Sequence, residues 1–393
     1  MQNREITCKD EFLSIVLLKM IATKKILVSV TNDLVTDQRV HKVCTFLSEN
    51  GFEVILIGRK RKHSLTMEKR IYSTKRMRLL FDKGVAFYVE YTIRLFFVLI
   101  SKKCTHILSN DLDTLLPSYV AKKLKRKCTF IYDSHEYFTE VPELIAHPTK
   151  KKIWETVEKF IFPKLKKVYT VNESIAEKYR SKYHVEVAVV RNLAPKWYPV
   201  DIKSKEQLGI PVNRKLIIAQ GAGINVDRGI EEAVQAMKYT ENMFLMIVGD
   251  GDVVEQLKQT VLEENLNNKV GFYAKRPYQE MMQYTYYADL GITLDKDTNL
   301  NYRFSLPNKV FDYIQAKTPI LASDLVEVKK VVLENKVGVI ITSHDPKDLA
   351  KDFDEILSNE EELNELKKNC EETAQRLSWE NELQTLKKIY EIS

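Results

Sequence analysis

One nine-residue segment in the second half of the chain has the residue types to hold a phosphorylated sugar: Ser305-Leu306-Pro307-Asn308-Lys309-Val310-Phe311-Asp312-Tyr313. Pro307 suits the first position of a helix, and Ser305 lies just before it, near the capping position. The start of this helix would offer free N–H groups and a positive dipole, with the Lys309 ammonium in its first turn. Asp312 falls one turn after Asn308, where its carboxylate could accept two sugar hydroxyls. The segment therefore fits a nucleotide diphosphate; the alternative is a capped surface helix with a Lys309–Asp312 pair.

The residues around this segment predict where its helix lies. Leu290–Leu294 has the pattern of a buried strand, and Thr318–Ser323 that of a turn followed by another strand. The helix would thus begin after the carboxyl end of a parallel strand. Open α/β sheets bind their ligands at that edge.

Two glycine turns follow strands that come earlier in the same half. Gly221-Ala222-Gly223 precedes Arg228-Gly229, so the backbone could approach a phosphate while the Arg228 guanidinium grips its oxygens. The third glycine of a dinucleotide fingerprint is missing. Gly249-Asp250-Gly251 forms a second tight turn, which need not bind a ligand. Asp250 lies where a dehydrogenase would place its ribose carboxylate, so that class stays open.

In the first half, polar residues also follow predicted strands. His135 comes at the end of a strand that faces the expected cleft, where a substrate ligand would lie; the alternative is a histidine that satisfies local hydrogen bonds. The Asp111-Leu112-Asp113 segment resembles an acidic pair that holds a metal–diphosphate, but we favour Asp111 as a helix cap. Asp37 and Arg39 also point toward the cleft.

Strand and helix patterns alternate along the whole chain. The expected strands are Ile26–Val30, Glu53–Ile57, His106–Ser109, Thr129–Tyr132, Lys167–Val171, Val185–Val190, Lys215–Gln220, Phe244–Val248, Val270–Tyr273, Leu290–Leu294, Ile320–Ala322 and Gly338–Ile341. Such alternation predicts an α/β protein with two parallel-sheet domains. We expect an N-terminal extension (1–22), a first domain (23–195), a second domain (205–376) and a last helix (377–393).

Cysteine and histidine usage argues against a metal centre. The 393 residues include five cysteines with no CxxC pair and seven histidines without zinc-binding spacing. Scattered cysteines are typical of reduced, mostly buried thiols in a cytosolic protein.

Charge is divided unevenly between the two halves. Residues 1–200 contain 37 Lys and Arg against 21 Asp and Glu, whereas the remainder of the chain has 24 against 33. Basic clusters at Arg59–Lys62 and Lys122–Lys127 flank the apolar segment Val85–Ile100, which Glu90 and Arg94 interrupt. This segment is shorter than the ~20 residues needed to span a bilayer. It could attach the protein to an anionic membrane face or form a buried core helix. No nucleic-acid-binding motif accompanies the basic half.

Taken in order, these segments resemble the GT-B glycosyltransferases of family 4 over about residues 24–391. The motifs are Asp37-Gln38-Arg39-Val40, Asn110-Asp111-Leu112-Asp113-Thr114, Tyr132-Asp133-Ser134-His135-Glu136, Thr170-Val171-Asn172-Glu173, Asp227-Arg228-Gly229-Ile230, Val248-Gly249-Asp250-Gly251 and Leu306-Pro307-Asn308-Lys309-Val310-Phe311-Asp312-Tyr313. The resemblance implies two Rossmann-like, doubly wound domains that face a central cleft, with the last helix crossing back to the first domain.

The same resemblance implies the roles of individual residues. Arg228 and Lys309 would hold the diphosphate, Asp312 the ribose and His135 the transferred sugar; His135, Arg228 and Lys309 are thus the candidate catalytic residues. The candidate nucleotide-sugar ligands are Gly221, Gly223, Arg228, Gly249, Asp250, Ser305, Leu306, Asn308, Lys309 and Asp312.

This sequence also departs from the family pattern. Of two glutamates eight positions apart, Asp312 matches the second, and Phe304 occupies the position of the first. Ala222 stands where an arginine is common, and Thr31–Leu34 replaces a glycine-rich loop.

The implied function is a retaining transfer of sugar from a nucleotide-diphosphate sugar, without metal or cofactor, to a saccharide or lipid-linked acceptor in cell-surface polysaccharide or glycolipid synthesis. The protein would be cytoplasmic, with attachment to the inner face of the plasma membrane as an option. Two alternatives remain: a nucleotide-sugar epimerase of the same fold, and a non-catalytic nucleotide-sugar-binding protein.

Overall fold

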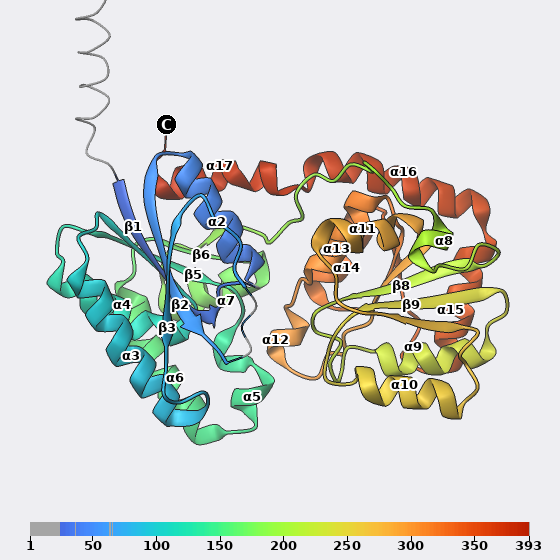
Figure 1. Ribbon diagram of the computed structural model, residues 1–393, viewed down its shortest axis with the longest axis horizontal. Helices are drawn as coiled ribbons and strands as arrows, with labels where there is room; N and C mark the ends of the chain where they lie inside the picture. Colours follow the sequence, from blue (N-terminus) through green and yellow to red (C-terminus); the bar gives the residue numbers. More distant parts are fainter. Residues whose placement is uncertain (1–23, 36, 63, 65, 393) are drawn as a thin grey trace, which may run out of the picture.

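The computed structural model describes residues 24–392 other than 36, 63 and 65. The predicted N-terminal extension, residues 1–22, lies outside this part of the chain. The described residues form two α/β lobes side by side, joined by a connecting segment and by the end of the chain, where a long helix on the C-terminal lobe is followed by one on the N-terminal lobe (Figure 1). The prediction of two Rossmann-like domains with a central cleft is confirmed.

The N-terminal domain contains a parallel sheet in the order β3-β2-β1-β4-β5-β6-β7. Its strands are β1 (Lys24–Asp33), β2 (Phe52–Lys60), β3 (Ser73–Arg78), β4 (His106–Asn110), β5 (Thr129–Ser134), β6 (Val168–Thr170) and β7 (Ala188–Val189). Its helices are α2 (Gln38–Glu49), α3 (Gly84–Ser101), α4 (Leu112–Leu124), η1 (Phe138–Glu140), α5 (Pro142–Ile145), α6 (Pro148–Ile161), η2 (Phe162–Lys164) and α7 (Glu173–Tyr183).

Helices cover both faces of this sheet. Side chains of β1 alternate between the two layers: Ile26 and Val28 pack with α2, and Leu27 packs with α3. Further along the same face as α3 come α4, α6 and α7, whose apolar side chains share one core. Along the sheet, the chain moves one way from β1 to β2 and the other way from β3 onward. Because the crossovers are right-handed, these two directions place their helices on opposite faces of the sheet.

The C-terminal domain repeats the architecture with the order β10-β9-β8-β11-β12-β13, again all parallel. Its strands are β8 (Lys215–Gly221), β9 (Met243–Gly249), β10 (Val270–Tyr273), β11 (Leu290–Thr293), β12 (Ile320–Ala322) and β13 (Gly338–Ile340). Its helices are α8 (Lys205–Leu208), α9 (Ile230–Ala236), η3 (Met237–Tyr239), α10 (Val254–Glu263), α11 (Tyr278–Tyr287), α12 (Leu300–Arg303), α13 (Asn308–Ala316), α14 (Val326–Glu334), α15 (Pro346–Ser358) and α16 (Glu360–Arg376).

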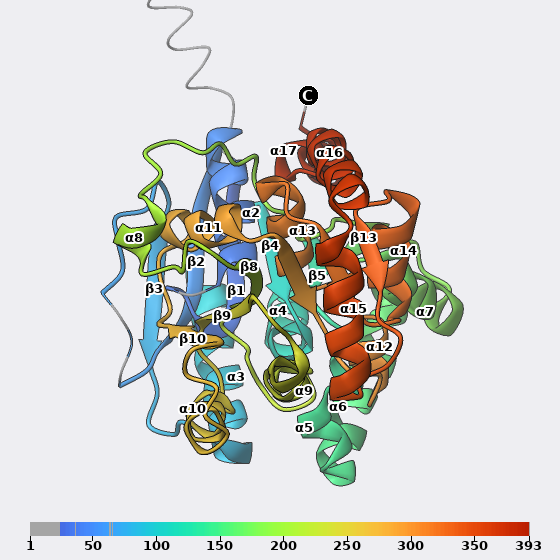
Figure 2. The ribbon, with the colours of Figure 1, turned by 90° about the vertical axis from the view of Figure 1, so that its right-hand side faces the viewer.

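Two apolar cores cover the two faces of this second sheet (Figure 2). Residues of β8 alternate between them, with Ile217 beside α9 and α15 and Ile218 beside α13 and α14. The last helix, α17 (Trp379–Tyr390), then crosses to the N-terminal domain, where Trp379, Leu386 and Tyr390 join the core under α2.

All twelve expected strands are present, and their ends differ from the expected ones by at most three residues. The structure adds β3 (Ser73–Arg78), which was not among the expected strands because half of its residues are charged. β3 is an edge strand, where charged side chains are usual. Its Met77 is buried, and Arg76 pairs with Asp33 at 2.9 Å. Arg59 and Lys60 of the basic cluster pair with β3, so this part of the cluster is ordered sheet.

Candidate active site

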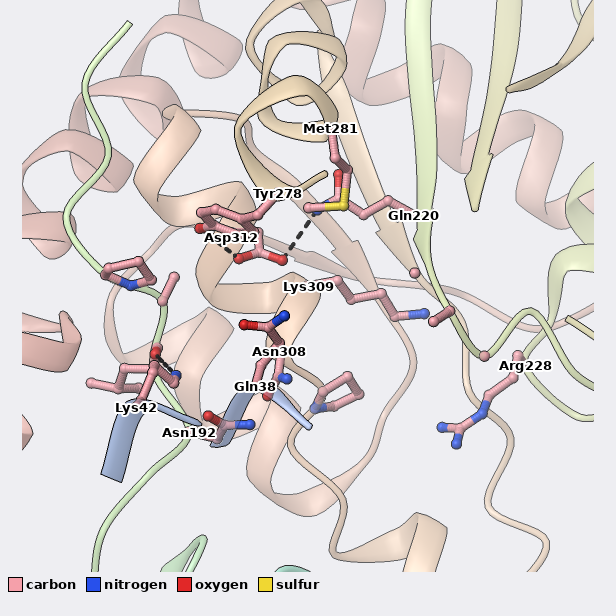
Figure 3. A pocket seen from close by; sticks show the side chains of 17 residues that line it. Gln38, Lys42, Asn192, Gln220, Arg228, Tyr278, Met281, Asn308, Lys309 and Asp312 are labelled. Carbon is pink, nitrogen blue, oxygen red and sulfur yellow. Dashed lines mark hydrogen bonds between the residues drawn. The ribbon is translucent and has the colours of Figure 1, made fainter. Parts of the chain in front are cut away.

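A cavity of about 450 Å³ lies between the two domains, at the carboxyl ends of the strands (Figure 3). Its volume is in the range of small-molecule sites. The residues that line it are Gln38, Lys42, Asn192, Leu193, Ala194, Pro195, Gln220, Gly221, Ala222, Gly223, Arg228, Tyr278, Met281, Pro307, Asn308, Lys309 and Asp312. The structure thus brings together Gly221, Gly223, Arg228, Asn308, Lys309 and Asp312 of the predicted site. The other predicted residues (His135, Gly249, Asp250, Ser305 and Leu306) do not line the cavity.

Two cations share a single buried carboxylate at one end of the cavity. Arg228 donates from Nη1 to Oδ1 of Asp295 at 3.0 Å, and Nζ of Lys309 lies 4.0 Å from Oδ2 of the same residue. Asp295 lies two residues after the end of β11 and is buried. Asp295 was not among the predicted site residues, although it shares with His135 the signal of a polar side chain just after a strand end.

The electrostatics of this end favour an additional anion. Burial lowers the pKa of Lys309, with Arg228 adding to the effect and Asp295 opposing it. For Arg228, burial also acts against the charge, but Asp295 and then Tyr302 raise its pKa above the ordinary value. Two cations against one carboxylate leave a positive excess in a largely desolvated place. A diphosphate would neutralise that excess.

The first turn of α13 faces the same end. The helix begins at Asn308, one residue later than predicted. Pro307 therefore stands at the N-cap and not at the first helical position. Ser305 does not cap the helix, and its Oγ has no hydrogen-bond partner. No side chain caps this end, so its N–H groups and positive dipole are available to an anion.

Asp312 occupies the opposite part of the cavity and does not pair with Lys309, so the alternative of a Lys309–Asp312 surface pair is wrong. Its Oδ1 accepts from the hydroxyl of Tyr278 at 3.1 Å, and its Oδ2 from Nε2 of Gln220 at 3.2 Å (Figure 3). Burial raises the pKa of Asp312 to about 6, although Tyr278, Lys42 and Gln220 stabilise the ionised form. Two fixed donors hold the carboxylate in place, and each of its oxygens has a lone pair left for a sugar hydroxyl.

The glycine turns bring the backbone close to the cavity. Gly249 has φ of 145°, and a Cβ there would lie 1.8 Å from the carbonyl oxygen of Gly221. Only a glycine at this position therefore lets the two glycine turns pack against each other. Gly229 has φ of 72°, and its Cβ would lie 2.3 Å from the carbonyl oxygen of Leu294. This close approach places Arg228 beside β11. Asp250 is exposed and accepts from the N–H of Gly251.

The N-terminal domain contributes residues that the sequence analysis missed. Lys42 of α2 donates to the carbonyl oxygen of Leu193 at 2.7 Å and lies over the ring of Trp379. Burial lowers its pKa to about 7, with Arg39 adding to the effect and Asp312 opposing it. Lys42 therefore faces Asp312 across the cavity. No local pattern in the sequence marks it, because only the crossing of α17 and the connecting segment bring it there.

His135 lies outside the cavity, with both ring nitrogens occupied. Nδ1 lies 3.2 Å from Oδ2 of Asp111, and Nε2 lies 3.2 Å from Oδ2 of Asp133 and from Oδ1 of Asn110. Burial alone would lower its pKa, but Asp111 and Asp133 raise it to about 9. The two carboxylates therefore favour the protonated form of the ring. A sugar hydroxyl would have to displace one of these acceptors.

Three other first-domain expectations need correction or refinement. Asp111 stands at the N-cap of α4, but its side chain makes no capping bond and accepts from the N–H of His135 at 2.8 Å, so the cap interpretation is wrong. Asp37 caps α2 through the N–H of Val40. Arg39 does not face the cleft, because its guanidinium is buried in a fork on Asp133 at 2.8 and 3.0 Å.

The departure at Phe304 has a structural reason. Phe304 is buried against the first domain, in the core that contains Tyr137 and Tyr179, and its carbonyl accepts from Asn172. Nearby, Oδ1 of Asn301 accepts from the N–H of Tyr137 at 3.2 Å. The α12 segment therefore contacts the first domain, and the Phe304 ring is packed in that contact.

The arrangement defines a class of protein: two Rossmann-like domains enclosing a cavity with cationic groups, a helix start and a buried carboxylate. Among residues 24–392 with the stated gaps, no group of three or more His, Cys, Asp or Glu could hold a metal ion. The family model "Glycosyltransferase Family 4" matches residues 37–193, and "Glycosyl transferases group 1" matches residues 200–375. The chain belongs to the GT-B glycosyltransferase family of this group 1 and family 4 type, as the resemblance predicted.

Known proteins resemble the chain at low identity. Chitobiosyldiphosphodolichol beta-mannosyltransferase from Candida albicans is 24% identical over 195 residues, which are 46% of this chain and 41% of that protein. The chain spans less than half of the length of the curated relatives that it matches. The structure of sucrose-phosphate synthase from Thermosynechococcus elongatus superposes with a TM-score of 0.75 at 17% identity, covering 94% of this chain and 98% of that one. HepE of Anabaena, in complex with UDP-glucose, gives 0.71 at 14% identity, covering 93% and 99%.

Proposed function

We propose that the protein is a retaining glycosyltransferase that moves a sugar from a nucleotide-diphosphate sugar to a saccharide or lipid-linked acceptor in cell-surface polysaccharide or glycolipid synthesis. The observation that carries this proposal is the cavity itself, with Arg228, Lys309 and the start of α13 at one end and Asp312 at the other. The family match and the UDP-glucose bound by a protein of the same fold support it. The enzyme would act in the cytoplasm.

The reaction needs little covalent chemistry from the protein. The bond between the anomeric carbon and the diphosphate oxygen breaks, and the acceptor oxygen attacks the same face of the sugar. The proton of the acceptor hydroxyl passes to the departing diphosphate. Arg228, Lys309 and the dipole of α13 would stabilise the charge that develops on this leaving group. No metal or cofactor takes part in this proposal.

His135 has a different place in the proposal from the one the family resemblance implies. With its ring held by Asp111 and Asp133, it would contribute positive charge near the transferred sugar and position Asp111 at the edge of the cleft. A direct contact with the sugar would require the bond from Nε2 to Asn110 or Asp133 to open.

A panel of nucleotide-diphosphate sugars tests the proposal. We expect thermal stabilisation by one nucleoside diphosphate and its sugar, slow donor hydrolysis, and, with an acceptor, a product whose anomeric configuration by NMR equals that of the donor. An isomerised sugar formed from donor alone would favour the epimerase. If the nucleotide sugar binds but is neither hydrolysed nor transferred to any acceptor, a non-catalytic binding protein would be favoured.

Nucleotide affinity should depend on the ionisation of Asp312. If the ionised carboxylate accepts ribose hydroxyls, protons compete with the ribose, so affinity falls as the pH drops through about 6, the pKa of Asp312 in the free protein. Asp312→Ala should weaken binding at pH 7.5 by roughly 10- to 100-fold, since hydrogen bonds to charged groups are worth about 1.5–3 kcal/mol. Calorimetric titration with nucleoside diphosphate between pH 5 and 8 measures both effects.

The matched control for this prediction is Asp312→Asn, which keeps the shape and cannot titrate. Any fall in affinity that remains in this variant belongs to the diphosphate or to other groups, and the difference belongs to Asp312. Equal affinity in the Asp312→Ala variant and the unchanged protein would argue against the ribose role.

A further inference from the structure

Helix α3 presents an apolar ridge to solvent. Val85, Val89, Ile93 and Phe97, spaced four residues apart, are each between 51% and 63% exposed. The opposite ridge, Phe87, Tyr91, Leu95 and Leu99, is buried against the sheet. A surface helix normally turns charged residues outward. The outward ridge of α3 is thus an apolar face without a partner in the described chain.

This helix lies along the domain and does not cross a bilayer in this fold. α3 is 18 residues long, slightly longer than the apolar segment expected from the sequence. By length and composition it is the one helix among the described residues that could span a membrane, and only 22% of it is buried. However, Tyr91 donates to the carbonyl oxygen of Val30 at 2.7 Å, and its ridge fills the core over β1 and β2. Spanning would require that core to open. An interfacial position exposes only the outward ridge to lipid.

The charged residues that interrupt α3 have partners. Glu90 accepts from the N–H groups of Leu80 and Phe81 at 2.9–3.0 Å, and it pairs with Arg94 at 2.7 Å. The carboxylate therefore ties the loop before α3 to the helix and keeps its own charge neutralised. The same tie holds Leu80 and Phe81 at the surface, where both are exposed.

The neighbouring helices extend this surface. On the same face of the sheet, α4 lies next to α3, and α6 lies next to α4 (Figure 1). Each adds exposed apolar side chains: Leu116, Val120 and Leu124 on α4, and Ile153 and Phe160 on α6. More than half of the large apolar side chains exposed in the described chain lie between residues 80 and 160. We call the outward side of these three helices the α3–α4–α6 face.

Basic residues accompany the same face. Residues 75–127 contain 12 Lys and Arg but only four Asp and Glu, and of these four Glu90 is paired and Asp111 faces His135. A groove of about 750 Å³ between the end of α4 and η2 has no acidic residue in its lining. Its cations are Lys122, Lys123, Arg126, Lys164, Lys166 and Lys167.

We propose that the α3–α4–α6 face docks the protein on a bilayer that contains anionic phospholipid, with the apolar ridges at the acyl boundary and the lysines at the phosphates. Apolar side chains with a cluster of cations beside them match that surface in both respects. A second copy of the chain would bring two positive faces together, and a nucleic acid would leave the ridges in water. Each of the three helices begins at the carboxyl edge of the sheet, so one end of this face lies toward the cleft. A lipid-linked acceptor in the proposed function fits this position.

Sedimentation of the full chain with vesicles tests the docking. We expect binding to vesicles with one third phosphatidylglycerol, at least about tenfold weaker binding to phosphatidylcholine alone, and weakening with added salt. Val89→Glu combined with Ile93→Glu should weaken binding to the anionic vesicles by about tenfold or more, because the variant places two charges at the lipid boundary. Lys122→Glu with Lys123→Glu should weaken it too.

The matched control is Leu262→Glu combined with Leu333→Glu, at two exposed apolar positions on α10 and α14 of the other domain. It should bind vesicles like the unchanged protein. All variants alter exposed side chains, so equal thermal unfolding curves and equal nucleoside-diphosphate binding would show that the fold is kept. These readouts need no transfer reaction, so failure of docking and failure of the transferase proposal are separable.

Several results would overturn the proposal. Equal binding to neutral and anionic vesicles would show that anionic phospholipid is not recognised. A loss of vesicle binding in the control variant equal to that in the Val89→Glu and Ile93→Glu variant would show that the α3–α4–α6 face is not the docking surface. No binding to either vesicle, with light scattering showing a dimer that Val89→Glu and Ile93→Glu dissociate, would assign the face to a second copy.

Discussion

Replacing Lys309 or Arg228 by alanine is expected to slow sugar transfer by ~100-fold or more, because a donor that stabilises a developing anion is worth roughly 3–4 kcal/mol. Both side chains reach one end of the cavity, where Asp295 neutralises only one of the two charges. The diphosphate gains negative charge as the bond to the sugar breaks, so the loss should appear mainly in kcat. Nucleotide affinity should change less, since the first turn of α13 and Asp312 remain.

Initial rates of nucleoside-diphosphate release, with saturating donor and acceptor, measure this effect. Suitable controls are Lys317→Ala, at the exposed end of the same helix, and Arg376→Ala, whose guanidinium contacts Asn335 far from the cavity. Both should keep near-normal turnover. If both site variants also turned over at the normal rate, the assignment of the diphosphate end would be wrong.

The strands and the start of α13 were predictable because their signals are local. Short apolar runs bounded by turn residues, such as Leu290–Thr293 and Ile320–Ala322, are typical of buried parallel strands, and Pro307 marks a helix start within one residue. A cluster of polar residues after successive parallel strands then predicts one shared edge. This reasoning placed Gly221, Arg228, Lys309 and Asp312 around one cavity without knowledge of any contact.

The missed residues depend on contacts between distant segments. Lys42 faces the cavity only because the connecting segment and α17 bring α2 opposite α13, and Tyr278 reaches Asp312 from a different helix. The edge strand β3 was hidden by charged residues that an edge tolerates. For His135, the sequence shows a strand end but not that Asp111 and Asp133 both take its ring nitrogens. Proximity in the sequence cannot reveal such competition between partners.

Replacing Asp133 by alanine is expected to lower the free energy of unfolding of the N-terminal domain by about 3–5 kcal/mol, the usual cost of leaving one charge of a buried pair without its partner. Arg39 is 4% exposed, and its guanidinium makes two bonds to Asp133 and one to the carbonyl oxygen of Val190. Burial would raise the pKa of Asp133, but Arg39 and then His135 hold it below the ordinary value. Urea unfolding followed by circular dichroism at pH 7.5 measures the loss.

Two further variants separate the unpaired charge from the lost packing. Arg39→Met combined with Asp133→Leu removes both charges and should recover most of the stability, since apolar residues often replace a buried pair at little cost. Glu371→Ala breaks the exposed pair with Lys317 and should change stability little, because solvent already screens it. A double variant as unstable as Asp133→Ala would instead assign the cost to the polar network around His135. In that case Asp133 would stabilise the domain mainly by holding the imidazolium at the edge of the cleft.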